Sequence, residues 1–239
     1  MQQAIMLTIL SMVLAFELVL FSLPALNQIA KKKNFYHETA VSSKQDQPLT
    51  LGGLAIFVGF SISSVICTYP YGFNDFVAIV AAQTILFFFG VVYETIGLSK
   101  IRQTIVCIAA CAIVVYVGDV HVDLSLWHIP MWQTDLMCIS LILIGMISFS
   151  FIVSRPVLMY WFMFLMSLGF SIFFIAIKNY KWAVVSSALL GSILGGLHYN
   201  YVIGPKNIIR LGKTGVYIVS ILFGIFLVHL LQSLLVLAM

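Results

Sequence analysis

The sequence predicts an all-α integral membrane protein of about eight transmembrane helices, in a single polytopic domain over residues 1–239. Two observations predict it. Hydrophobic residues make up 62% of the chain and charged residues only 8%, against roughly 25% charged in an average soluble domain. Apolar runs long enough to cross a hydrocarbon core of roughly 30 Å also recur along the whole chain.

The apolar runs place the helices in order. They cover residues 4–26, 51–69, 74–93, 103–118, 135–154, 157–177, 182–203 and 215–238. The first run has no basic region before it and is followed by three lysines, Lys31 to Lys33, which favours a retained helix over a signal peptide. No polar stretch between the runs is long enough to form a second domain.

Basic residues predict the orientation. With an extracytoplasmic N-terminus, the cytoplasmic segments are 27–50, 94–102, 154–156 and 204–214. Those segments hold every Lys and Arg except Lys178 and Lys181. An excess of basic residues marks the cytoplasmic side, so both termini are predicted to be extracytoplasmic. The net charge of +4 then follows from topology and indicates no nucleic-acid partner.

Residues 118–132 carry a period of two between helices. Apolar residues alternate with His121, Asp123, Ser125 and Trp127; they are Val120, Val122, Leu124 and Leu126. This pattern predicts a short β-strand or hairpin on the outer membrane surface, with Trp127 and Trp132 at the headgroups. His121 and Asp123 fall on its wet face, which favours solvated polar residues over metal ligands.

The four cysteines all fall in or at the ends of predicted helices. They are Cys67, Cys107, Cys111 and Cys138. Cys107 and Cys111 share one helical face, and no second cysteine pair or histidine accompanies them in the sequence. Small buried apolar thiols are therefore predicted, and no metal site.

Four motifs carry a family resemblance. They are Thr50-Leu-Gly-Gly-Leu-Ala-Ile-Phe57, Phe87-Phe-Phe-Gly-Val-Val-Tyr-Glu-Thr-Ile-Gly-Leu-Ser-Lys100, Gly118-Asp-Val and Gly196-Leu-His-Tyr-Asn200. In order and spacing the chain resembles the polyprenyl-phosphate N-acetylhexosamine-1-phosphate transferases of glycosyltransferase family 4. That family includes the phospho-MurNAc-pentapeptide translocase and the GlcNAc-1-phosphate transferases of O-antigen and teichoic-acid synthesis. The resemblance covers nearly the whole chain and implies a multi-pass protein of the bacterial inner membrane, with a role in the cell envelope.

The same resemblance implies that the catalytic acids are missing. Enzymes of the family use Mg²⁺ to neutralise a nucleotide-sugar pyrophosphate while a lipid phosphate attacks it. The family's paired aspartates fall on Tyr93 and Glu94. Its later acidic motifs fall on Ser150, Val153, Ser154, Pro156 and Val157, and on Gly212, Lys213, Thr214, Gly215 and Val216. Its later histidine-rich loop has no counterpart, so a truncated and degenerate member is expected.

An inventory of carboxylates agrees with that expectation. Of the eight acids, Glu17 is mid-membrane and four aspartates are predicted outside: Asp75, Asp119, Asp123 and Asp135. Glu38, Asp46 and Glu94 face the cytoplasm, and no two of them are close in sequence. Hard divalent cations prefer charged oxygen ligands, so Mg²⁺ is expected to be lost and no catalytic residue is assigned.

Two further sets of residues are candidates for binding. The resemblance brings five basic residues of different cytoplasmic joints together, as a site for a lipid phosphate or headgroup; they are Lys100, Arg102, Arg155, Arg210 and Lys213. Anchoring and topology alone explain them equally well. Glu17 costs about 2–4 kcal/mol at mid-membrane, which makes it a candidate contact with a partner protein. The alternatives are a protonated acid that faces its own bundle or bonds Ser11, and a pairing with His229.

These features favour a catalytically inactive membrane subunit that binds another membrane protein, with or without a polyprenyl or phospholipid. The alternative is an active transferase that moves sugar-1-phosphate from a UDP-sugar to undecaprenyl phosphate in cell-envelope polysaccharide synthesis. A transporter or channel is a third class, which usually shows internal repeats, broken helices and paired intramembrane charges that this sequence lacks.

Overall fold

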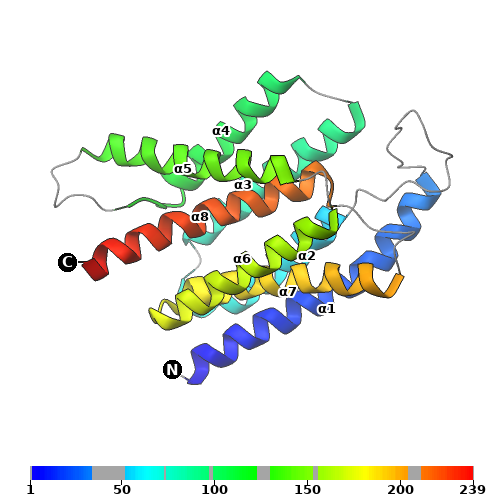
Figure 1. The fold of residues 1–239 in the computed structure, drawn as a ribbon, viewed down its shortest axis with the longest axis horizontal. Helices are drawn as coiled ribbons and strands as arrows, with labels where there is room; N and C mark the ends of the chain where they lie inside the picture. Colours follow the sequence, from blue (N-terminus) through cyan, green and yellow to red (C-terminus); the bar gives the residue numbers. More distant parts are fainter. Residues whose placement is uncertain are drawn as a thin grey trace. The chain divides into compact units, whose positions relative to one another are not determined.

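The computed structural model describes residues 2–33, 52–72, 74–96, 99–122, 130–152, 156–203 and 211–238. All regular structure in these residues is helical (Figure 1). The elements are α1 (Gln2–Lys33), α2 (Gly52–Thr68), the 3-10 turn η1 (Tyr69–Tyr71), α3 (Asn74–Ile96), α4 (Lys100–Tyr116), α5 (Met131–Ile152), α6 (Pro156–Ala176), α7 (Tyr180–Ile203) and α8 (Gly212–Ala238). The predicted all-α class is confirmed.

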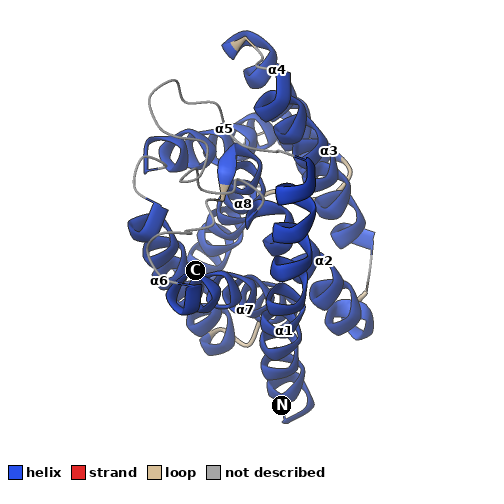
Figure 2. Ribbon diagram, turned by 90° about the vertical axis from the view of Figure 1, so that its right-hand side faces the viewer, coloured by secondary structure: helices blue, strands red, loops and turns tan. Residues whose placement is uncertain are grey.

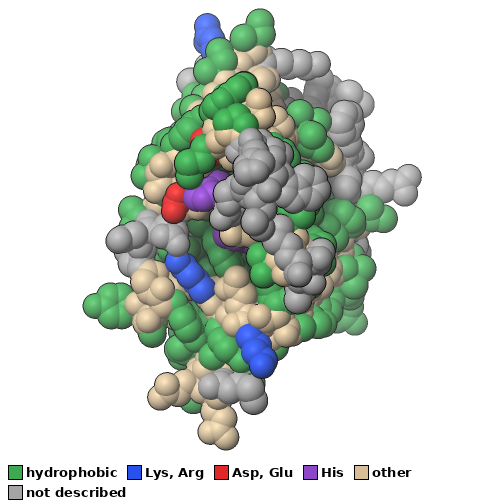
Figure 3. Space-filling view, turned by 90° about the vertical axis from the view of Figure 1, so that its left-hand side faces the viewer, with side chains coloured by type: hydrophobic (Ala, Val, Ile, Leu, Met, Phe, Trp, Pro, Cys, Tyr) green, Lys and Arg blue, Asp and Glu red, His purple; other side chains and the backbone are tan. Residues whose placement is uncertain are grey.

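Length and composition make the protein a multi-pass membrane protein. Of the described helices, seven are long and apolar enough to cross a membrane. The remaining helix, α4, has 17 residues and reaches about 26 Å at 1.5 Å per residue, slightly less than a typical hydrocarbon core. Hydrophobic side chains are spread widely over the described surface in Figure 3, and few of the described side chains there are charged.

The hairpin predicted for residues 118–132 is corrected. Where the structure describes this segment, at 118–122 and 130–132, it forms no strand, and α5 already begins at Met131. Residues 123–129 lie outside the described part. The alternation is nevertheless real, because Val120 and Val122 are each 1% exposed, whereas Asp119 is exposed and His121 half-buried. An extended chain alternates its side chains with or without a neighbouring strand, so the pattern predicted burial but not pairing.

The chain forms two compact units. Unit 1 comprises Met1–Tyr71 and Val153–Gly215, and unit 2 comprises Gly72–Ile152 and Val216–Met239. Unit 1 therefore holds α1, α2, η1, α6, α7 and the start of α8, and unit 2 holds α3, α4, α5 and the rest of α8. The single domain predicted from the sequence stays a prediction.

Helix α7 is the centre of unit 1, with α1, α2 and α6 packed against it. Small residues of α7, spaced one turn apart, let the backbone of α1 approach α7 closely, as is typical of membrane helices. A Cβ at Gly191 would overlap the carbonyl oxygen of Met12, and one at Gly195 would lie 3.0 Å from that of Phe16. One turn earlier, the Ser187 hydroxyl donates to the Thr8 carbonyl at 3.0 Å. Residue numbers rise together along this contact, so α1 and α7 run parallel (Figure 1, Figure 2).

The other helices of unit 1 run in the opposite direction. Ala55 of α2 packs with Leu23 near the end of α1, and Tyr160 of α6 shares a side-chain hydrogen bond with Asn200 near the end of α7. The amide of Gly53 donates to the carbonyl of Leu211 at 3.2 Å, which holds the start of α8 beside the start of α2. The ends of α1 and α7 and the starts of α2, α6 and α8 thus meet at one end of unit 1.

Unit 2 is built on antiparallel neighbours. A Cβ at Gly118, just after α4, would lie 3.1 Å from the Cβ of Ala78 near the start of α3. Helix α5 packs on α4, and Cys111 lies 3.9 Å from the sulfur of Met146. All four cysteines are free and buried, which confirms the buried thiols predicted from the sequence.

Aromatic and glycine contacts join α8 to α5 in the same unit. The rings of Phe149 and Phe223 stack with centroids 4.9 Å apart. A Cβ at Gly224 would lie 2.8 Å from the Cα of Ile142, so the two backbones approach closely. The described helix directions therefore alternate within each unit as the sequence predicts.

Candidate functional site

Part of the predicted cytoplasmic site gathers at one end of unit 2. Tyr93 and Glu94 lie in the last turn of α3, Lys100 and Arg102 open α4, and Ser150 lies near the end of α5. Because these helices are antiparallel neighbours, their five positions share one end of the unit. The Arg102 side chain is exposed and that of Tyr93 half-buried, while the other three side chains are not among those described.

The rest of the predicted site belongs to unit 1 or falls outside the described residues. Pro156 begins α6 and Lys213 is the second residue of α8, at the end of unit 1 where α1 also ends. Val153, Arg155 and Arg210 lie outside the described residues. Each unit thus brings some of these positions to one end, and the convergence of all five basic residues stays a prediction.

The donors at these positions do not fit Mg²⁺. Val153 and Pro156 have no side-chain oxygen, and Lys213 carries a cation. At ~5 Å from Mg²⁺ and an effective dielectric near 20, that cation would repel the metal by about 6–7 kcal/mol. Among the side chains that the structure describes, no three of His, Cys, Asp and Glu gather closely enough to hold a metal ion.

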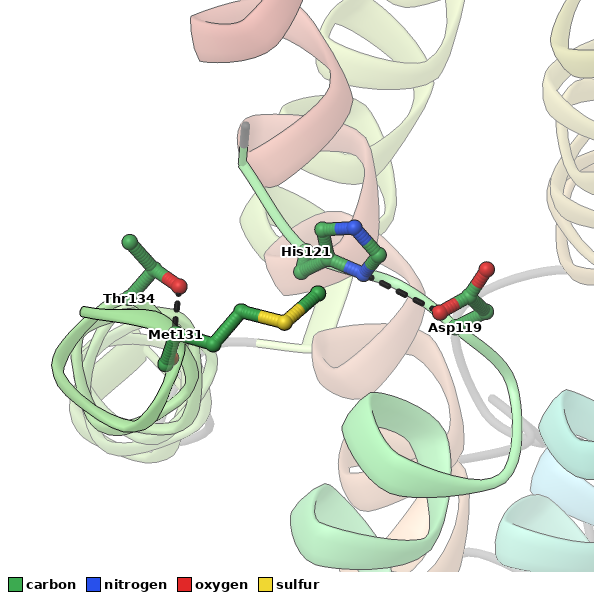
Figure 4. Close-up of polar contacts among 4 residues, drawn as sticks. All are labelled: Asp119, His121, Met131 and Thr134. Carbon is green, nitrogen blue, oxygen red and sulfur yellow. Dashed lines mark hydrogen bonds and ion pairs between the residues drawn. The ribbon is translucent and has the colours of Figure 1, made fainter. Parts of the chain in front are cut away.

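Two of the remaining acids lie at the opposite end of unit 2. Asp119 follows the end of α4, where its φ of 52° is a left-handed conformation that Asp tolerates, and Asp135 lies in the first turns of α5. The length of α4, about 26 Å, separates them from Glu94. Asp119 Oδ1 lies 3.2 Å from His121 Nδ1, and its side chain is 84% exposed (Figure 4). To the left of this pair in Figure 4, the Thr134 hydroxyl donates to the Met131 carbonyl at 2.7 Å.

Glu17 lies on the outer face of α1. Its side chain is exposed, whereas Ala15 and Val19, two residues to either side, are 0% exposed. At roughly 100° per residue, Glu17 points about 160° away from both. A carboxylate that faces its own bundle was one alternative for this residue, and the structure contradicts it.

The hydroxyl proposed as an intramolecular partner of Glu17 is engaged elsewhere. Ser11 Oγ lies 2.8 Å from Ser187 Oγ and 3.1 Å from the Val184 carbonyl oxygen, on the buried side of α1. Within the described part of the chain, no hydrogen bond or ion pair reaches Glu17. The carboxylate is therefore available at the surface of a membrane-spanning helix.

Sequence reasoning missed the residues that join α1 to α7. Ser187, Gly191 and Gly195 recur every four residues and form a small-residue stripe, which the spacing alone could have revealed. It also gave no contact for His198 of the Gly196–Asn200 motif, whose ring meets that of Phe16 edge-on with centroids 5.9 Å apart. An aromatic partner on another helix leaves no signal in the sequence around a histidine.

No family model matches the chain, and no curated protein matches it either. The resemblance to the polyprenyl-phosphate sugar-1-phosphate transferases therefore stays a prediction that rests on the four motifs.

Proposed function

We propose that this protein is a non-catalytic membrane subunit derived from the polyprenyl-phosphate N-acetylhexosamine-1-phosphate transferases. It resides in the bacterial inner membrane with both termini extracytoplasmic. It binds another membrane protein, and its cytoplasmic basic residues bind the phosphate of a polyprenyl lipid or phospholipid. It transfers no sugar phosphate.

The observation that carries the proposal is the replacement of metal-binding carboxylates. A pyrophosphate in a transferase needs several oxygen ligands around Mg²⁺. At the corresponding positions stand Tyr93, Val153, Pro156 and Lys213, and Glu94 is the sole carboxylate. A single carboxylate supplies too few charged oxygen ligands to hold a divalent cation against water.

The placement of the other acids supports the same conclusion. Asp119 and Asp135 lie at the end of unit 2 opposite Glu94, and Glu17 lies in the apolar part of α1. Asp119 and Asp135 cannot approach Glu94 without a rearrangement of the helices of unit 2 that carry them. Within the described helices of unit 2, Glu94 therefore has no second carboxylate at its own end. Glu38 and Asp46, the other acids predicted to face the cytoplasm, are far from it in sequence.

A transferase assay tests the proposal. The purified full chain is incubated with undecaprenyl phosphate, Mg²⁺ and UDP-GlcNAc or UDP-MurNAc-pentapeptide, and UMP release is measured beside an active transferase of the family. No UMP is expected. UMP release that EDTA abolishes and that Glu94→Gln also abolishes would overturn the proposal and establish the alternative, an active transferase.

A further inference from the structure

The outward face of α1 is apolar except for one carboxylate. It consists of Met6, Ile9, Val13, Glu17 and Phe21. The four apolar side chains are 66%, 56%, 45% and 77% exposed in that order, and Glu17 is exposed among them. Val13 and Phe21 lie one turn to either side of Glu17, so all three share one strip of the helix surface.

The opposite face of α1 is fully occupied within unit 1. Thr8, Ser11 and Ala15 are at most 5% exposed. Ser11 pairs with Ser187 of α7, and a Cβ at Gly59 of α2 would lie 3.0 Å from the Ala15 carbonyl oxygen. Because α1 is already anchored on this side, it cannot rotate to bury Glu17 without breaking those contacts.

Glu17 lies deep in the apolar stretch. The spanning part of α1 is Gln2–Leu26, which places Glu17 about 14 Å from Leu26 and about 22 Å from Gln2 at 1.5 Å per residue. Neither headgroup region is within reach of a glutamate side chain. A carboxylate at this depth needs a polar or cationic partner inside the membrane.

We propose that the outward face of α1 binds one transmembrane helix of a different membrane protein, and that this helix carries a Lys or Arg at the depth of Glu17. The inference rests on the proposed function as a subunit and names its contact and the chemistry of its partner. The apolar side chains of α1 on either side of Glu17 pack against that helix, and the Glu17 carboxylate pairs with the Lys or Arg of the partner.

A second copy of this chain does not satisfy the same face. None of its 12 Lys and Arg residues falls inside a predicted apolar run, so another copy offers neither cation at that depth. Two copies related by a two-fold axis through α1 would instead bring the two Glu17 carboxylates together. Like charges at that depth oppose association.

Model helices in liposomes test the charge recognition directly. Three labelled 19-residue polyleucine helices with identical flanks carry Lys, Leu or Glu at the depth of Glu17, and energy transfer to the reconstituted full chain reports binding. The Lys helix is expected to bind about 3- to 30-fold more tightly than the Leu helix, the range of interhelical polar contacts in membranes. Glu17→Leu should remove this preference, and Glu17→Gln should reduce it.

A register control distinguishes the pairing from a loss of fold. A fourth polyleucine helix carries its Lys one turn away, at the depth of Val13. The double variant Val13→Glu/Glu17→Leu should prefer this fourth helix. Equal binding of all three helices to the wild type would overturn the proposal, as would a preference that persists in Glu17→Leu. A change of oligomeric state in Glu17→Leu without a change in helix binding would assign the face to self-association and also overturn it.

Photocrosslinking in cells tests the same contact with the native partner. A crosslinking amino acid is placed at Val13 or Phe21, with the exposed Phe88 of α3 as the control position. The peptide captured from positions 13 and 21, but not 88, should come from a spanning helix with an internal Lys or Arg. Capture of this chain itself, or of a helix without such a residue, would overturn the proposal. The transferase assay is independent of both experiments, so a failed contact and a failed pseudoenzyme assignment give different results.

Discussion

Gly191 has almost no freedom to vary, because the backbone of α1 occupies the space where a side chain would stand. A Cβ at this position would overlap the Met12 carbonyl oxygen and lie 2.8 Å from the Met12 carbonyl carbon. Backbone atoms cannot swing aside as the end of a flexible side chain can. A single methyl group must therefore push α1 and α7 apart along the contact that organises unit 1.

The first prediction at this scale is that Gly191→Ala destabilises the protein by about 1–3 kcal/mol, the usual effect of overpacking. Thermal unfolding in detergent measures the change. Gly169→Ala in α6 is the matched control, since a Cβ there meets nothing within 4 Å. The control should be neutral or more stable by up to about 1 kcal/mol, because alanine favours the helix. Equal effects of the two substitutions would contradict the close approach.

The direction of Glu17 could have been predicted from the sequence. Ala4, Thr8, Ser11 and Ala15 are small residues three or four apart, which is typical of a buried membrane-helix face. Glu17 falls on the opposite side of the same helix. The apolar run alone places Glu17 well inside a spanning helix, whereas its direction follows only from the spacing of those small residues.

At the scale of the helix, hydropathy predicted the described elements to within a few residues at most ends. The exception is α1, expected over 4–26 and observed over Gln2–Lys33. Pro24 lies inside it without ending it, as neighbouring structure allows in membrane helices. The lysines that mark the membrane boundary belong to the same helix. Hydropathy locates the apolar part of a helix, but a helix continues into water as long as its backbone bonds are satisfied.

Helix ends also set where a lipid phosphate would bind. Arg102 lies in the first turn of α4 and Lys213 in the first turn of α8, each at the end of its unit that is predicted to be cytoplasmic. We expect Arg102→Gln and Lys213→Gln each to weaken binding of undecaprenyl phosphate about 5-fold, as a cation near a membrane surface contributes about 1 kcal/mol. Native mass spectrometry or a thermal shift with added lipid measures it.

Two controls separate phosphate recognition from general lipid affinity. Undecaprenol has the same chain without the phosphate, and its binding should not change in either variant. Lys178→Gln and Lys181→Gln remove cations at the other predicted membrane surface and should leave undecaprenyl phosphate binding unaltered. If all four substitutions acted alike, the basic residues would serve anchoring and topology alone.

For the whole molecule, the predicted orientation has a direct chemical test. Cysteine introduced at Ser125 should react with a membrane-impermeant thiol reagent added outside the cell, and cysteine at Ser43 should not. The four native cysteines are buried, so the background reaction is expected to be low. The reverse labelling pattern would overturn the orientation and with it the side assigned to every basic residue.

The pairing of distant helices is the part of the fold that the sequence could not supply. Ser187 and Thr8 are 179 positions apart, and several other helices also carry small residues that could face α1. Hydropathy gives each helix a length and a direction but no neighbour. The division into two units, with α8 beginning in one and continuing in the other, has the same origin.

The contact between α1 and α7 joins two helices that the ribosome makes at different times. The ribosome must add 179 residues after Thr8 before Ser187 exists to meet it, which takes about 10–35 s at typical elongation rates. During this interval α1 resides in the bilayer without its principal neighbour. The hydroxyls of α1 have hydrogen-bond acceptors within the same helix, because Thr8 Oγ1 donates to the Ala4 carbonyl at 2.9 Å and Ser11 Oγ to the Thr8 carbonyl at 2.9 Å. Glu17 has no such local acceptor or donor, so a nascent chain carries its least lipid-compatible group from the first helix onward.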